Sequence, residues 1–216
     1  MIERSFSEVF AGALHGVPTV VVRHGEEPTA LPVDLWSRTA DGHDLALVGL
    51  CCGPTLDVGC GPGRLTAALA AAGHVALGID VVEAAVALTR ERGASAVRRD
   101  VFARVPGEGR WATALLADGN IGIGGDPVAL LHRLRRLLAP GGRVVVEVEG
   151  PGVGTARGWA SLEAPGHRSR PFRWATLGVD DLAGVARSAG LDVLEVHRLG
   201  ERHAAVLSEP TGAPSW

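Results

Sequence analysis

The sequence predicts a doubly wound α/β fold, in which a mostly parallel sheet carries helices on both faces. Short apolar segments alternate along the chain with longer segments rich in Ala and Leu, and glycines separate many of them. No apolar run approaches the roughly 18–20 residues that are needed to cross a membrane. The 216 residues suit one domain with a sizeable core, so we expect a single domain over residues 1–216.

The regular pattern begins near residue 54. Segments typical of buried strands fall at residues 54–58, 75–79, 96–98, 112–117, 143–148, 191–196 and 204–207. Segments typical of helices fall at residues 64–72, 82–92, 127–138 and 179–189. In such a sheet the carboxyl ends of the strands meet along one rim, where ligands bind. We therefore expect the glycines after Val58 to share this rim with Asp80, Asp100 and Asp118.

Two parts of the chain fit the pattern less well. Residues 1–50 form an N-terminal extension, in which we expect a strand over residues 19–22 and a helix over residues 44–50. We expect this extension to contribute to a substrate site or to its lid. Residues 150–176 are rich in Gly, Pro, Arg and Trp, which predicts an inserted loop or lid.

Composition excludes several classes of protein. The formal net charge of −3 indicates no general affinity for nucleic acid, and the N-terminus lacks the apolar core of a signal peptide. The three cysteines, Cys51, Cys52 and Cys60, form neither a disulfide framework nor a zinc site, so we expect no metal and a reducing, cytoplasmic compartment. The chain contains no Lys and no Tyr, which excludes a P-loop lysine, a Schiff-base lysine and a catalytic Tyr–Lys pair.

A glycine-rich segment follows the strand expected at residues 54–58. Its glycines at 59, 61 and 63 follow the pattern Gly-x-Gly-x-Gly, and the third glycine of a dinucleotide-binding Gly-x-Gly-x-x-Gly is missing, since Arg64 or Thr66 would stand there. Glycines let the backbone approach a ligand closely, and the helix that follows offers free N–H groups. The alternative is a plain turn between a strand and a helix.

These residues belong to a wider set of motifs. The segment Thr55-Leu56-Asp57-Val58-Gly59-Cys60-Gly61-Pro62-Gly63, the acid in Gly78-Ile79-Asp80, the turn Arg99-Asp100-Val101 and the turn Leu138-Ala139-Pro140-Gly141-Gly142-Arg143 occur in register. Together they resemble the motifs of the class I S-adenosylmethionine (SAM)-dependent methyltransferases over roughly residues 50–149. The resemblance implies a Rossmann-like sheet of seven strands, with the last strand antiparallel, and SAM as the cofactor.

The resemblance also implies a set of cofactor-binding residues. They are Asp57, Gly59, Cys60, Gly61, Gly63, Asp80, Val81, Asp100, Val101 and Asp118. In such a family Asp57 orders the glycine loop, Asp80 accepts hydrogen bonds from both ribose hydroxyls, and Asp100 binds the adenine amino group. Val101 offers its backbone N–H to the ring, on which Val81 packs. Alternatives stay open, because Asp80 could cap a helix, Asp100 could be a solvated turn residue, and Cys60 could simply fill space.

The sequence offers several candidate residues for the acceptor side of the site. Candidates for a catalytic base are His167, Glu149 and Asp118, and each could instead be structural. The lone Asn120 follows the fourth strand and either contacts a ligand or serves as a turn residue. Residues 150–176 carry Arg157, Arg168, Arg170 and Arg173 among aromatic residues, which favours an anionic or sugar-bearing acceptor. The alternative is a solvated basic loop whose aromatic residues pack into the core.

We therefore expect methyl transfer from SAM to a small-molecule acceptor, with oxygen favoured as the acceptor atom, as in specialised metabolism. The loop after Asp118 lacks the Asn/Asp-Pro-Pro-aromatic motif of enzymes that methylate nucleic-acid bases, and we expect neither a nucleic acid nor a membrane as a partner. The chain is expected to be a monomer or a homodimer. The rival hypotheses are a SAM-binding protein without catalysis and a nicotinamide-dependent oxidoreductase.

Overall fold

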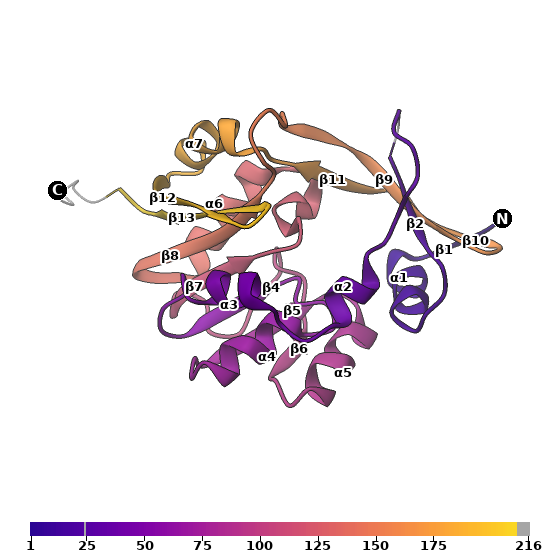
Figure 1. The fold of residues 1–216 in the computed structure, drawn as a ribbon, viewed down its shortest axis with the longest axis horizontal. Helices are drawn as coiled ribbons and strands as arrows, with labels where there is room; N and C mark the ends of the chain where they lie inside the picture. Colours follow the sequence, from indigo (N-terminus) through magenta and orange to yellow (C-terminus); the bar gives the residue numbers. More distant parts are fainter. Residues whose placement is uncertain (24, 211–216) are drawn as a thin grey trace.

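Two β-sheets organise the chain in the computed structural model, which describes residues 1–23 and 25–210 (Figure 1). The larger one, here called the core sheet, has seven strands in the order β12-β13-β8-β7-β4-β5-β6. They are β4 (Thr55–Val58), β5 (Ala76–Asp80), β6 (Ala96–Arg98), β7 (Trp111–Leu116), β8 (Leu138–Val148), β12 (Asp192–Leu199) and β13 (Arg202–Ser208). Pairing is parallel from β6 to β8, and β13 is antiparallel to both of its neighbours. The expected seven-stranded, mostly parallel sheet is confirmed.

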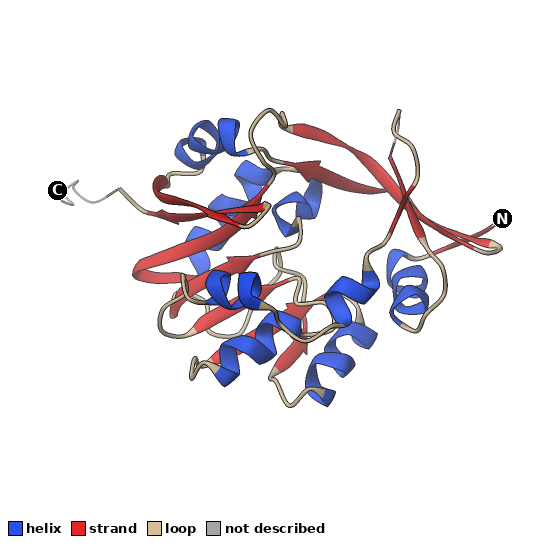
Figure 2. Cartoon of the chain, in the orientation of Figure 1, coloured by secondary structure: helices blue, strands red, loops and turns tan. Residues whose placement is uncertain are grey.

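Helices cover both faces of the core sheet (Figure 2). They are α3 (Gly42–Val48), α4 (Arg64–Ala71), α5 (Glu83–Glu91), α6 (Pro127–Leu137) and α7 (Val179–Ser188). Side chains alternate between the two faces of a strand, and β7 shows the result. Ala114 and Leu116 join the apolar cluster under α6 and α7, whereas Leu115 joins the cluster under α3 and α4. The sheet is therefore buried on both sides, as its nearly continuous apolar strands predict.

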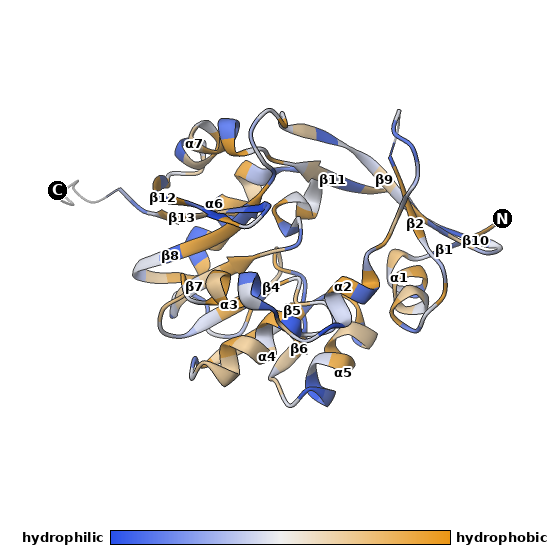
Figure 3. Ribbon diagram, viewed as in Figure 1, coloured by the Kyte–Doolittle hydropathy of each residue, from blue (hydrophilic) through white to orange (hydrophobic). Residues whose placement is uncertain are grey.

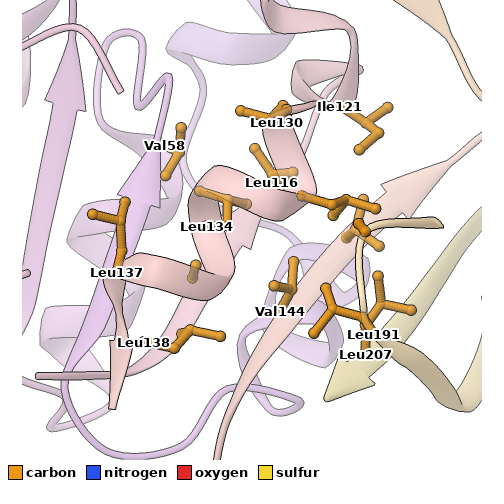
Figure 4. Close-up of a cluster of buried hydrophobic side chains, with 14 of the residues drawn as sticks. Val58, Leu116, Ile121, Leu130, Leu134, Leu137, Leu138, Val144, Leu191 and Leu207 are labelled. Atoms are coloured by element: carbon orange, nitrogen blue, oxygen red, sulfur yellow. The ribbon is translucent and has the colours of Figure 1, made fainter. Parts of the chain in front are cut away.

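The larger apolar cluster lies between α6 and the sheet (Figure 4). Leu130, Leu134 and Leu137 are fully buried there, at the helical spacing that the sequence shows. The helix begins after Asp126, whose carboxylate accepts a hydrogen bond from the backbone N–H of Val128 at 3.1 Å. Figure 3 shows the same division, with apolar colouring along the central strands and polar colouring at many of the exposed turns.

A second sheet extends beyond the rim of the core sheet and was not expected. It has six strands, of which five follow the order β1-β10-β9-β2-β3 while β11 pairs with the other part of β9. Their bounds are β1 (Ile2–Arg4), β2 (Val20–Arg23), β3 (Thr29–Ala30), β9 (Ala156–Ala164), β10 (His167–Ser169) and β11 (Phe172–Thr176). Residues 150–176, expected as an inserted loop or lid, thus contribute three strands to this sheet. The segment gains its order by pairing with residues 2–4 and 20–23, and such distant pairing leaves no local pattern.

The N-terminal extension is also more ordered than expected. The strand and helix expected at residues 19–22 and 44–50 appear as β2 and α3, with their bounds shifted by one or two residues. Of two further helices, α1 (Phe6–Leu14) lies beside the second sheet and α2 (Val33–Ser37) lies next to α1 (Figure 1). Ser5 and Glu8 form a reciprocal capping box at the start of α1. Within the described ranges, no helix is both long and apolar enough to cross a membrane.

Candidate functional site

A cavity of about 590 Å³ separates the core sheet from the second sheet. One wall, here called the rim, consists of the turns that follow the core strands. The opposite wall, here called the roof, comes from α1, α2, β2, β3, β9 and β11. The rim contains most of the residues that the sequence singles out, namely Asp57, Gly59, Cys60, Gly61, Asp80, Val81, Asp100, Val101 and Asp118. The structure therefore brings together on one wall residues that are spread over 62 positions of the sequence.

Gly59 and Gly63 have different structural roles in the loop after β4. Gly59 has a φ of 73°, and a Cβ there would lie 2.7 Å from Nδ2 of Asn120. That amide instead donates hydrogen bonds to the backbone oxygens of Val58, at 3.0 Å, and Gly59, at 2.9 Å. Asn120 therefore fixes the loop and is not a left-handed turn residue. Gly63 does not line the cavity. It is needed for packing, since the absence of a side chain lets the start of α4 approach Thr89 of α5.

Asp80 ends β5 and joins two neighbouring turns. Its Oδ2 accepts a hydrogen bond from the backbone N–H of Gly61 at 3.0 Å, and its Oδ1 accepts one from Val82 at 2.8 Å. Burial raises the pKa of this carboxyl, and the backbone hydrogen bonds oppose the shift. Each oxygen of an ionised carboxylate can accept a second hydrogen bond, so Asp80 can hold the loop and still bind two hydroxyl groups in the cavity.

Asp57 lies at the base of the glycine loop and is 2% exposed. Burial raises its pKa to about 6, although the hydroxyl of Thr66 donates to Oδ2 at 2.6 Å and lowers the pKa. Cys60 is also buried, and burial raises the pKa of its thiol well above the usual range. A reactive thiolate at this position is therefore disfavoured.

Asp100 and Val101 form the turn after β6. Oδ1 of Asp100 accepts the backbone N–H of Phe102 at 2.9 Å, which fixes the turn. The carbonyl of Val101 accepts a hydrogen bond from Nε of Arg133 at 2.8 Å. Because Arg133 belongs to α6, this helix holds the turn in place. Val81 is 41% exposed beside it and offers an apolar face to the cavity.

Asp118 belongs to a buried cluster of charges that the sequence did not indicate. It has a positive φ of 52°, and both of its oxygens accept Nη2 of Arg64, at 2.7 and 2.5 Å. Arg64 also donates to Asp44 of α3, which is fully buried. Burial raises the pKa of Asp118, and the positive charge of Arg64 acts against this. Because Arg64 already occupies both of its oxygens, Asp118 is a poor candidate for a general base, although burial leaves its pKa raised.

The same cluster ties three distant parts of the chain to the rim. Arg202 of β13 donates to Asp44 at 2.6 Å and to Glu147 of β8 at 2.5 Å. Glu147 in turn accepts the backbone N–H of Asp118 at 2.8 Å. Burial would raise the pKa of Asp44, but hydrogen bonds from Arg64, from the backbone of Asp41 and from Arg202 hold it well below its usual range.

The other two candidate bases do not line the cavity. His167 lies in β10, where it pairs with Ile2 of β1 and with Ala164 of β9. Glu149 is exposed after β8, and its backbone N–H donates to the carbonyl of Leu177 at 2.9 Å. The structure thus gives neither side chain a position from which it could reach a ligand in this cavity.

The roof is rich in aromatic rings, although the chain is only 4% aromatic. Phe6 of α1 stacks on Phe10 with 5.3 Å between centroids, and its edge meets Phe172 of β11 at 4.9 Å. Phe10 lies 5.9 Å from Trp36, and Phe172 lies 6.2 Å from Trp174. All five rings line the cavity. The i, i+4 spacing of Phe6 and Phe10 is a signal that sequence reasoning could have used.

Comparisons with known proteins find similarity to methyltransferases. The model of a family described as a methyltransferase domain matches residues 55–142. The trans-aconitate 2-methyltransferase of Paracidovorax citrulli (strain AAC00-1) is 35% identical over 117 residues, which are 51% of this chain and 45% of that protein. The match therefore spans less than half of the length of that curated relative.

Solved structures share the fold along most of the chain. A SAM-dependent methyltransferase from Bacteroides fragilis, in complex with S-adenosylhomocysteine (SAH), superposes with a TM-score of 0.77 at 20% identity, covering 94% of each chain. The CcbJ methyltransferase of Streptomyces caelestis gives a TM-score of 0.62 at 20% identity, over 81% of this chain and 92% of that one. At this level of identity the similarity concerns the fold.

Proposed function

We propose that this chain, which belongs to the class I SAM-dependent methyltransferases, transfers a methyl group from SAM to a small molecule held under the roof. The observation that carries the proposal is the arrangement of one cavity between two unlike walls. The acidic rim contains the residues expected to bind SAM, and the aromatic roof faces them across a cavity of about 590 Å³. A cavity of this size suits a small acceptor, whereas a nucleic acid would need a broad, positively charged surface.

The rim fits SAM in its shape and in its donor and acceptor groups. A Cβ on Gly61 would meet no atom within 4 Å, so the loop offers bare backbone to the cavity. We assign Asp80 to the ribose hydroxyls, and Asp100 with Val101 to the adenine. Asp57 orders the loop, and Arg64 with Asp118 lies at the end of the rim where the methionine part would bind.

The cofactor supplies a methyl group on a positively charged sulfur, which a lone pair of the acceptor can displace in line. The protein has to align the acceptor and exclude water. Among the described residues that line the cavity there is no His and no Glu, and Asp118 is clamped by Arg64. We therefore propose an acceptor whose reacting atom is already deprotonated when it binds, so that no protein base is needed. An ionised oxygen meets this condition, and the positively charged sulfur of the cofactor attracts it.

A transfer assay tests the proposal. The purified chain is incubated with methyl-labelled SAM and a panel of small organic acids, phenols and amines. We expect the label to appear in a small product, together with an equal amount of SAH. If the chain binds SAM and transfers label to no member of the panel, the result favours a SAM-binding protein without catalysis.

A further inference from the structure

We propose that Arg23 is a specificity residue of the roof and that it binds an anionic group on a flat, largely apolar acceptor. This inference rests on the proposed function, because it assigns the roof side of the same cavity. No motif in the sequence singled out Arg23. The four arginines that the sequence did single out, at residues 150–176, turn out to be engaged elsewhere.

Each of those four arginines has a partner that does not line the cavity. Arg168 pairs with Glu163 at 3.3 Å and Arg170 pairs with Glu3 at 3.3 Å. Arg157 pairs with Asp126 at 3.3 Å. The guanidinium of Arg173 lies 4.2 Å from the ring centroid of Trp159, which is half-exposed and does not line the cavity.

Two further arginines of the cavity wall belong to the rim. Arg64 is committed to Asp44 and Asp118. Arg99 follows β6 beside Asp100, at the adenine end of the rim, and donates to the carbonyl of Arg98. Two arginines of the roof line the cavity, Arg23 and Arg173. The guanidinium of Arg173 lies over the ring of Trp159, whereas Arg23 has only a long ion pair to an exposed glutamate among the described residues.

The register of the second sheet places Arg23 beside the aromatic rings. Arg23 of β2 lies opposite Ala160 of β9, and Ala160 lies opposite Phe172 of β11. Residues directly opposite one another share a face of the sheet, so Arg23 and Phe172 flank Ala160 on the face that lines the cavity. Two strand spacings, about 10 Å, separate their backbones. A ring stacked on Phe172 could therefore extend an acidic group to Arg23 across the small Ala160.

Arg23 has donors to spare. Among the described residues it forms one ion pair, from Nη1 to Glu26, which at 3.3 Å is long, and the side chain of Glu26 is 54% exposed. Its Nε is buried and has no hydrogen-bond partner among the described residues. A carboxylate, sulfonate or phosphate could accept two parallel hydrogen bonds from the guanidinium and satisfy this buried donor.

The charges of the two walls orient such an acceptor. The rim presents the carboxylates of Asp57, Asp80, Asp100 and Asp118, whereas the roof presents Arg23 among rings. An anionic group is repelled by the first wall and attracted by the second. The acidic group that Arg23 binds therefore faces away from the rim, and the rest of the acceptor can approach the methyl group.

Two fluorescent probes test this inference, because they differ chiefly in charge. 1-Anilinonaphthalene-8-sulfonate is a flat aromatic anion, and N-phenyl-1-naphthylamine is its uncharged counterpart. Each is titrated into the SAH-saturated protein, so that the rim is filled. We expect both to bind, and Arg23→Gln to weaken the anion at least tenfold while changing the neutral probe less than twofold. Arg23→Lys, which keeps the charge, should lose less.

Arg168→Gln is the matched control, because it removes an arginine of the same sheet that does not line the cavity. It should leave both affinities unchanged. The inference is overturned if the wild type fails to bind the anion, if Arg23→Gln weakens neither probe, or if it weakens both alike. Calorimetry with SAH on every variant separates the two proposals. If the wild type does not bind SAH, the proposed function is refuted. If it binds SAH but Arg23→Gln does not weaken the anionic probe more than the neutral one, only the role of Arg23 is refuted.

Discussion

The two walls of the cavity are built in opposite ways. The rim consists of turns that directly follow β4, β5, β6 and β7, and its polar groups are held by backbone hydrogen bonds and buried ion pairs. The roof combines the first 36 residues with residues 156–176, and its surface is made of side chains, mostly rings. A wall of backbone and carboxylates suits one invariant ligand, whereas a wall of side chains can be changed residue by residue. We infer that the rim serves the cofactor and the roof selects the acceptor.

Removing Asp44 should give the largest effect, because it breaks the support of the rim. Asp44→Ala leaves Arg64 and Arg202 with one carboxylate fewer in a buried cluster. Breaking a buried pair in this way costs about 3–5 kcal/mol of unfolding free energy. Urea unfolding measures the loss. Asp41→Ala is the control, since its half-exposed carboxylate caps the same helix and should cost about 1 kcal/mol. Equal losses in the two variants would contradict the importance of the cluster.

Removing Asp80 should weaken cofactor binding and leave the roof intact. Asp80→Ala would remove two hydrogen bonds to a charged group, each worth roughly 1.5–3 kcal/mol, so SAH affinity should fall about 100-fold or more. Glu149→Ala is the matched control, because this exposed acid does not line the cavity. Calorimetry with SAH compares both variants with the wild type. An unchanged affinity in Asp80→Ala would mean that Asp80 only fixes the turns around it.

Asp57 should make stability depend on pH. Because its pKa is raised from 3.8 to about 6 by burial, the folded state holds this proton at pH values where the unfolded chain has lost it. Stability should therefore fall as pH rises through this window, by about 2 kcal/mol between pH 4 and pH 6. The asparagine of Asp57→Asn cannot ionise, so its own contribution to stability does not change with pH. The stability of this variant relative to the wild type should therefore rise by that amount over the same range. A difference that stays flat with pH would contradict a shifted Asp57.

The arginines on the outside of the second sheet should matter least. Arg168→Ala and Arg170→Ala each remove an exposed ion pair, which is worth about 0–1 kcal/mol. We expect SAH affinity, acceptor use and unfolding free energy to stay close to those of the wild type. Thermal unfolding and the transfer assay measure this, and a selective loss of acceptor use would move the acceptor site toward these residues.

The same contrast explains which parts were predictable from the sequence. The rim follows from local motifs, because the glycines, Asp80 and Asp100 lie at strand ends that the apolar segments mark. The roof depends on pairing between Val20–Arg23 and Ala156–Ala164, which are well over 100 residues apart, and Gly158 and the arginines hide the alternation in that segment. The ion-pair cluster around Asp44 could not be predicted for the same reason, since Arg64 and Arg202 contact Asp44 only in the folded chain.

The most direct test of the central claim compares two cofactors on the wild-type protein. The purified chain is titrated with SAH and, separately, with NAD in the same calorimeter and buffer. Our account assigns the rim to SAM on the spacing of Gly59, Gly61 and Gly63 and on the position of Asp80. It predicts saturable binding of SAH at one site per chain and no binding of NAD. Binding of NAD without binding of SAH would contradict it.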